Sequence, residues 1–225
     1  MGAYEVTGPC RGCRASGPAQ MTLSTSISHS PVQVDSIGTL AWNALTVPLG
    51  LVRAFSDVAK IGYAAAMSED SRKVPFEIRR LSASDAVSYR DLRLNGLQAH
   101  PEAFGASREE EAAQTLAWFA DRLDRNVIFA GGPAGTSDLM GVVGFYALDS
   151  AKQRHKGVLW GMFVQPEARG TGLGSSLVAR VLEHAMRTVE EVRLTVVATN
   201  TAAVRFYERA GFEQYGLERR ALKMG

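Results

Sequence analysis

Glycine occupies every second position from residue 170 to residue 174, in the segment Arg169-Gly170-Thr171-Gly172-Leu173-Gly174-Ser175. An apolar run ends at Val164 just before this segment, and a helical pattern follows it, so the glycines lie where a strand leads into a helix. The first N–H groups of a helix have no acceptor within it, and the helix dipole adds partial positive charge there. Glycine also lets the backbone come close to a ligand. The segment therefore predicts an anion-binding turn suited to a pyrophosphate.

The spacing of the glycines tests which nucleotide this turn could bind. The Rossmann fingerprint requires Gly-x-Gly-x-x-Gly, and here the third glycine comes one position early. A Walker loop requires Gly-Lys followed by Ser or Thr, and that sequence does not follow the turn. A glycine-rich turn that binds no ligand stays open as an alternative from spacing alone.

Composition narrows the class of protein. The chain has 225 residues, of which 46% are hydrophobic, and a formal net charge of +2, which suits one globular domain with an additional segment. The weak positive charge gives no reason to expect nucleic acid as a partner. The two cysteines, Cys10 and Cys13, lack the further ligands of a zinc site and imply no disulfide framework. The best apolar stretch, residues 37–52, is too short to span a membrane, so we expect a cytoplasmic protein without metal.

The elements that would position the turn follow from periodicity. From residue 75 onward we expect a strand, two helices, three strands, a helix, a strand, a helix and a strand. Residues 158–164 form the strand before the turn. Ser107 is expected to open the second helix; Asn200 should cap the last one and Gly211 should end it. This order predicts a mixed α/β sheet.

The chain before this domain is harder to interpret. Residues 1 to about 35 are rich in Ser, Gly, Thr and Pro, which is typical of poorly ordered chain. Residues 37–67 are more apolar, with spacing that partly suits a helix. We therefore predict a poorly ordered N-terminal extension at 1–74, with a helical part at about 37–67, and a single domain at 75–225.

Two motifs together resemble a known family. The first surrounds the glycine turn and reads Val164-x-Pro166-Glu167-x-Arg169-Gly170-x-Gly172-x-Gly174. The second reads Asn200-Thr201-Ala202-Ala203-Val204-Arg205-Phe206-Tyr207-Glu208-Arg209-Ala210-Gly211-Phe212. In this order and at this distance they resemble the GNAT superfamily of acetyl-CoA-dependent N-acetyltransferases, over about two-thirds of the chain. The resemblance implies a mixed, mostly antiparallel sheet flanked by helices, with acetyl-CoA as co-substrate.

The resemblance also implies which residues bind acetyl-CoA. They lie on the strand before the turn, in the turn itself and at the start of the last helix. These residues are Met162, Phe163, Val164, Arg169, Gly170, Thr171, Gly172, Leu173, Gly174, Ser175 and Asn200. Plainer roles remain open for some of them: Met162 and Val164 as core residues, Arg169 as a solvated arginine and Asn200 as a helix cap.

Catalysis would fall to Tyr207, which matches the family tyrosine that protonates the sulfur of CoA. A phenol with an ordinary pKa of about 10 is a proton donor at neutral pH. The alternative is an aromatic residue packed on a helix beside Phe206. No general base is evident, and Glu109, Glu110 and Glu111 are weak candidates because acidic residues at a helix start usually cap it.

The resemblance predicts one strand more than the sequence supplies. Residues 212–222 suit the penultimate strand of the family, and the last strand, which inserts beside it, is missing after them. We expect an exposed sheet edge and an incomplete acceptor side, unless the apolar stretch before Met67 covers the gap. Such a chain would be marginally stable or impaired.

Together these observations predict an N-acetyltransferase that acetylates a primary amine of a small molecule, with a homodimer as a possible assembly. One alternative is acetylation of protein N-termini or lysines. Another is a catalytically silent module that binds acyl-CoA. The sequence does not identify the acceptor.

Overall fold

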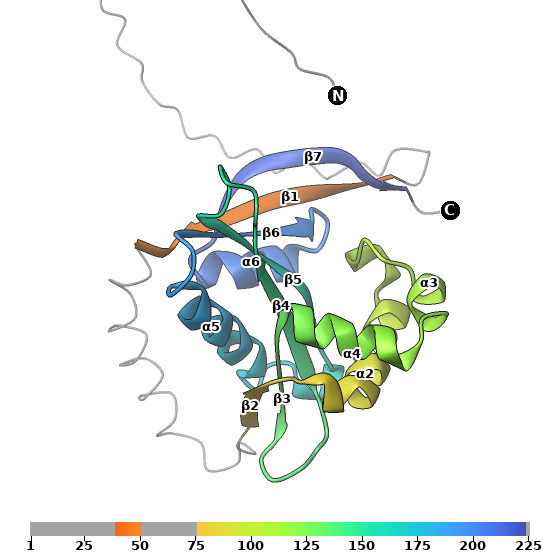
Figure 1. The fold of residues 1–225 in the computed structure, drawn as a ribbon. Helices are drawn as coiled ribbons and strands as arrows, with labels where there is room; N and C mark the ends of the chain where they lie inside the picture. Colours follow the sequence, from red (N-terminus) through yellow and green to blue (C-terminus); the bar gives the residue numbers. More distant parts are fainter. Residues whose placement is uncertain (1–38, 51–75, 224–225) are drawn as a thin grey trace, which may run out of the picture. The chain divides into compact units, whose positions relative to one another are not determined.

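A computed structural model describes residues 39–50 and 76–223 of the chain (Figure 1). The predictions for Cys10, Cys13 and residues 1–35 lie outside the described residues. The described strands form one seven-stranded sheet in the order β2-β3-β4-β5-β6-β1-β7. Neighbouring strands are antiparallel except β5 and β6, which are parallel. The predicted mixed, mostly antiparallel sheet with flanking helices is confirmed.

The elements follow the predicted order from residue 76 onward, with one additional strand ahead of them. They are β1 (Thr39–Pro48), β2 (Phe76–Arg80), η1 (Ala83–Asp85), α2 (Ala86–Ala99), η2 (Pro101–Ala103), α3 (Arg108–Ala112), α4 (Leu116–Arg125), β3 (Val127–Pro133), β4 (Gly141–Ala147), β5 (Lys156–Val164), η3 (Pro166–Ala168), α5 (Leu173–Ala185), β6 (Glu191–Val197), α6 (Thr201–Arg209) and β7 (Glu213–Lys223).

The second predicted helix is divided in two. Ser107 opens α3, as expected, and its hydroxyl accepts a hydrogen bond from the N–H of Glu110 at 3.1 Å. The chain then turns, and Thr115 caps α4 by accepting from the N–H of Trp118 at 3.2 Å. Because Thr115 supplies a second local cap, residues 108–125 form two short helices rather than one.

Strand β1 occupies the central position between β6 and β7 (Figure 1). It pairs antiparallel with both, so that Leu45 lies opposite Leu194 on one side and opposite Gln214 on the other. The helical interpretation is therefore wrong for residues 39–48; residues 51–67 of that stretch lie outside the described part. The predicted boundary at residue 75 leaves β1 outside the domain, although it is hydrogen-bonded within its sheet.

The position expected to be empty because the last strand is missing is thus occupied by β1, which comes from the N-terminal part of the chain. Leu45 and Val47 alternate with less buried residues and pack in the same core as α5. This period of two is what a strand with one covered face requires. The described sheet has no unpaired edge at β6 on this side, because residues 42–48 of β1 pair with it.

The sheet separates two hydrophobic clusters. Ile128 packs with residues of α2 and α4, whereas its neighbour Phe129 packs with residues of α5. Successive residues of a strand point to opposite faces, so α2 and α4 cover one face and α5 covers the other. The chain runs from the end of β5 at Val164 through η3 into the glycine turn and then into α5.

Candidate functional site

The parallel strands β5 and β6 separate part-way along their length. Their pairing covers only Lys156 to Val158 on β5, although β5 continues to Val164 and β6 to Val197. The register between β4 and β5 also shifts at this level, and Gly161 has a φ of +62°. Among the described strands, the edge of β5 beyond Val158 that faces β6 therefore has no strand partner. Its backbone groups are available to an extended ligand.

The glycine turn closes one end of this opening. Gly170 and Gly172 have φ values of +77° and +94°, in the left-handed region that favours glycine. Gly172 is the N-cap of α5, and its carbonyl accepts the N–H of Ser176 at 3.0 Å. The N–H groups of Gly174 and Ser175 come before that bond and have no acceptor within the helix. The turn therefore has the backbone arrangement of an anion site.

Gly174 lets the start of α5 approach the strand. A Cβ at this position would lie 3.3 Å from the Cε of Met162 and 3.6 Å from the ring of Phe206. The first contact is tighter than ordinary van der Waals distance. The third glycine of the turn thus brings α5, β5 and α6 together at one point.

Arg169 is an exposed residue held against the end of β5. Its Nε–H donates to the carbonyl of Val164 at 3.1 Å, and its Nη2 lies 3.0 Å from the Nε2 of His100. The Nδ1 of His100 faces Glu102 at 3.4 Å, so the consistent tautomer carries the proton on Nδ1 and accepts from Arg169 on Nε2. These contacts place the guanidinium beside the glycine turn.

Tyr207 lies next to the unpaired stretch of β5. Its side chain is buried between Phe206 and Phe212, with ring centroids at 5.2 and 5.7 Å. Its hydroxyl donates to the Sδ of Met162 at 3.4 Å, a weak acceptor that a better one can replace. Burial raises the pKa of Tyr207 above its ordinary value, so the phenol stays protonated at neutral and moderately alkaline pH.

Asn200 caps α6, as its residue type predicts. Its side-chain oxygen accepts the N–H of Ala203 at 3.0 Å, and Gly211 follows the helix with a φ of +90°. Asn200 is exposed at the start of α6, and its amide NH₂ takes no part in this cap.

The weak candidates for a general base are engaged otherwise. Glu110 takes part in the capping box of α3, and Glu109 is exposed. Glu111 is buried, and its ion pairs with Arg93 and Arg122 hold its pKa below its ordinary value despite the opposing effect of burial. A carboxylate with a lowered pKa is a poor base, which argues against Glu111 in that role and leaves Glu109 and Glu110 as weak candidates from the sequence.

Sequence reasoning missed the cluster formed by Arg93, Glu111 and Arg122. Arg93 lies on α2, Glu111 on α3 and Arg122 on α4. Charged residues on helices normally lie in solvent, and no periodicity marks these three as buried. The only signal was the acidic run itself, and it could equally be read as capping.

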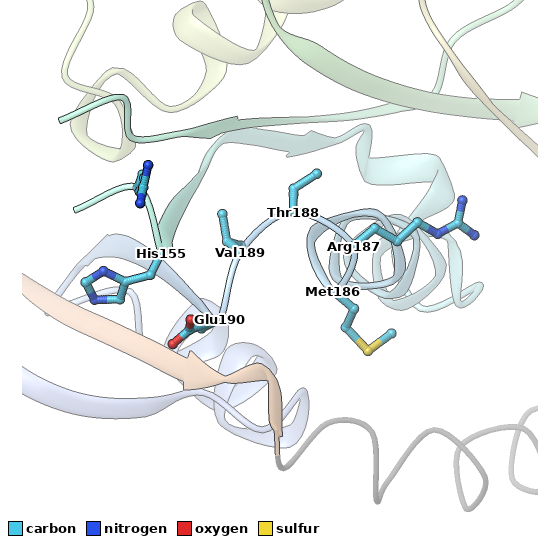
Figure 2. Close-up of a pocket in the computed structure, with 7 residues that line it drawn as sticks. His155, Met186, Arg187, Thr188, Val189 and Glu190 are labelled. Atoms are coloured by element: carbon cyan, nitrogen blue, oxygen red, sulfur yellow. The ribbon is translucent and has the colours of Figure 1, made fainter. Parts of the chain in front are cut away.

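Two cavities in the described residues lie away from the glycine turn and Tyr207. The first, of about 430 Å³, lies at the C-terminal end of α5, where His155, Met186, Arg187 and Glu190 line it (Figure 2). The second, of about 560 Å³, lies between α2 and the β3–β4 connection. The described residues hold no group of three or more His, Cys, Asp or Glu side chains that could bind a metal ion. None of the described helices is long and apolar enough to cross a membrane.

Comparison with known proteins agrees with this geometry. The profile of the "Acetyltransferase (GNAT) family" matches residues 94–212, more than half of the chain and including the glycine turn and the C-terminal part of α2. The chain belongs to the GNAT acetyltransferase family. The match covers all eleven residues that the sequence assigned to cofactor binding as well as Tyr207.

Individual relatives are more distant. The chain is 28% identical over 179 residues to a mycothiol acetyltransferase of Kocuria rhizophila, covering 76% of this chain and 55% of that protein. It is 33% identical over 88 residues to an uncharacterised N-acetyltransferase of Methanocaldococcus jannaschii, covering 36% of this chain and 39% of that protein. The chain thus spans about half or less of the length of these curated relatives.

Solved structures show the same fold. A GNAT acetyltransferase of Streptococcus pneumoniae superimposes with a TM-score of 0.55 at 23% identity, over 63% of this chain and 87% of that one. A probable acetyltransferase of Staphylococcus epidermidis superimposes with a TM-score of 0.54 at 20% identity, over 67% and 91% of the two chains.

Proposed function

We propose that this protein transfers an acetyl group from acetyl-CoA to a primary amine of a small molecule. The observation that supports this most directly is the separation of β5 from β6, with the glycine turn at one end and the hydroxyl of Tyr207 beside Met162. Each part of this site suits one part of acetyl-CoA. The anion-binding turn suits the pyrophosphate, the unpaired strand edge suits the amide-containing arm, and the proton donor suits the sulfur leaving group.

In this proposal each part of the site has a separate task. The turn from Arg169 to Ser175 binds the pyrophosphate through backbone N–H groups, and the edge from Met162 to Val164 pairs with the amides of the pantetheine arm. Bound acetyl-CoA supplies a thioester, whose C–S bond breaks as the amine nitrogen bonds to the acetyl carbon. Tyr207 gives its proton to the sulfur, and water takes the proton that the amine loses.

Two alternatives keep the same cofactor site. One is acetylation of protein N-termini or lysines, and the other is a silent acyl-CoA-binding module. The relatives named as mycothiol acetyltransferases support a small-molecule acceptor, and β1 removes the structural reason to expect an impaired protein. A cytoplasmic location and a homodimeric assembly stay predictions from sequence.

Calorimetry with acetyl-CoA, followed by thiol detection with a panel of amines and peptides, tests the proposal. Binding with turnover of small amines is the expected result. Turnover of peptides alone would favour the protein acetyltransferase, and binding without turnover would favour the silent module. Failure to bind acetyl-CoA would contradict all three.

Replacing Gly172 by Ala should raise the Kd for acetyl-CoA about 10-fold. The new Cβ strains a left-handed residue and shifts the N–H groups of the turn. Isothermal titration measures the change. Gly135→Ala is the matched control, because Gly135 also has a positive φ, +77° against +94° for Gly172, and open space around it, but lies in the β3–β4 connection. Equal Kd values for the two variants would show that the turn does not bind the cofactor.

A further inference from the structure

A buried cluster of opposite charges lies between the helices that cover one face of β5. The Nε and Nη2 of Arg93 donate to the two carboxylate oxygens of Glu111 at 3.0 and 2.9 Å. The Nη1 of Arg122 donates to the same carboxylate at 3.1 Å. The side chains of Arg93 and Glu111 are each only 5% exposed. Two guanidinium groups therefore share one carboxylate, and the cluster carries one uncompensated positive charge.

One donor of this cluster has no acceptor. The Nη1 of Arg93 is buried without a hydrogen-bond partner among the described atoms. It lies 3.5 Å from the point where a Cβ of residue 161 would stand, so it faces the backbone of β5 at Gly161. Gly161 lies in the stretch where β5 has separated from β6, and it precedes Met162, which the hydroxyl of Tyr207 contacts. The free donor is thus directed at the strand that carries the proposed reaction.

Neighbouring groups reinforce the need for an acceptor. The ring of Phe104 stacks on the guanidinium of Arg93 at 4.8 Å and shields it from water. The indole Nε1–H groups of Trp160 and Trp42 are also buried without a partner in the described structure. Trp160 precedes Gly161, and Trp42 packs beside Gly105, next to Phe104. An indole only donates, as does a guanidinium. The Nε1 of Trp160 lies over Gly144 of β4, whereas the Nη1 of Arg93 lies at Gly161, so Arg93 supplies the free donor beside the opening.

We propose that Arg93 determines specificity by binding a carboxylate of the acceptor, so that the acceptor is an amino carboxylate. This inference rests on the proposed acetyltransferase function. A neutral carbonyl would satisfy the free N–H, but only an anion would also balance the net positive charge of the cluster, in which two guanidinium groups share one carboxylate. A carboxylate bound there holds the amine of the same molecule beside Gly161 and Met162. In this role Arg93 binds the acceptor and takes no proton.

The test compares α-, β- and γ-amino acids with their primary amides at saturating acetyl-CoA, with kcat/KM expressed per unprotonated amine. A charge-assisted hydrogen bond predicts that at least one free acid exceeds its amide about 10- to 100-fold. Arg93→Lys, which keeps the charge near Glu111 but loses the Nη1 donor, should reduce this ratio to near one. Arg122→Lys is the matched control: it alters the same ion-pair cluster and should keep the ratio. Thermal unfolding and the Kd for acetyl-CoA check that both variants are folded.

The outcomes separate this inference from the proposed function. Equal rates for acids and amides in the natural protein, or equal loss of the ratio in both variants, would overturn the role of Arg93 and leave acetyl transfer intact. If no amine is acetylated, titration of the same acids and amides into the protein in the presence of CoA decides the inference, and the absence of any preference for the acids overturns it. Failure to bind acetyl-CoA would count against the proposed function instead.

Discussion

Replacing Leu45 by Ala should lower the free energy of unfolding by about 2–5 kcal/mol. Leu45 is fully buried and packs in the core that α5 covers. Its strand, β1, lies between β6 and β7. The substitution removes apolar contacts and leaves a cavity that the strands on both sides cannot close. Denaturation in urea, followed by circular dichroism, measures the difference.

Leu217 is the matched control for this prediction. It lies on β7 opposite Asn43 and is 48% exposed, so Leu217→Ala should change stability by less than about 0.5 kcal/mol. A similar small effect for Leu45→Ala would mean that β1 does not hold its place in the sheet in solution.

A chain that begins at Met67 provides a stricter test of β1. It lacks the strand that joins β6 to β7, and β7 pairs with no other strand in the described sheet. We expect it to be unfolded or aggregated, because β6 and β7 would each present an open edge. A synthetic peptide of residues 37–50 added during refolding should restore part of the structure, and a peptide with the same composition in scrambled order should not.

Replacing Tyr207 by Phe should lower kcat about 10²- to 10³-fold and leave the Kd for acetyl-CoA nearly unchanged. The ring keeps its packing against Phe206 and Phe212, while the hydroxyl that contacts Met162 is lost. Stopped-flow thiol detection gives kcat, and calorimetry gives the Kd. Tyr215→Phe is the control, since Tyr215 is a 55% exposed tyrosine on β7 and should not affect either quantity.

The pH profile adds a test of the same role. Burial raises the pKa of Tyr207 above its ordinary value of about 10, so the phenol keeps its proton at neutral and moderately alkaline pH and remains able to donate it there. Any decline of kcat between pH 8 and 10 must then come from another group and should persist in Tyr207→Phe. A large rise in the Kd for acetyl-CoA would instead mark Tyr207 as a structural residue, and an unchanged kcat would exclude it as the acid.

The sequence by itself determined the features that depend on neighbouring residues. Ser107, Asn200 and Gly211 were placed correctly at helix ends, because a cap forms between groups a few residues apart. The glycine turn was located for the same reason, since positive φ values and a following helix start leave a local pattern. The assignment to the GNAT family rested on two such local segments.

Only the tertiary structure decided which distant segments meet. β1 joined a sheet whose other strands begin 28 residues after its end, and its short apolar run could equally suit a helix. The separation of β5 from β6 depends on which backbone groups find partners. Arg93 is buried against Glu111 beside Gly161 because α2, α3 and α4 pack together there. Side-chain type and spacing do not encode these contacts, because burial and pairing arise from the packing of the whole chain.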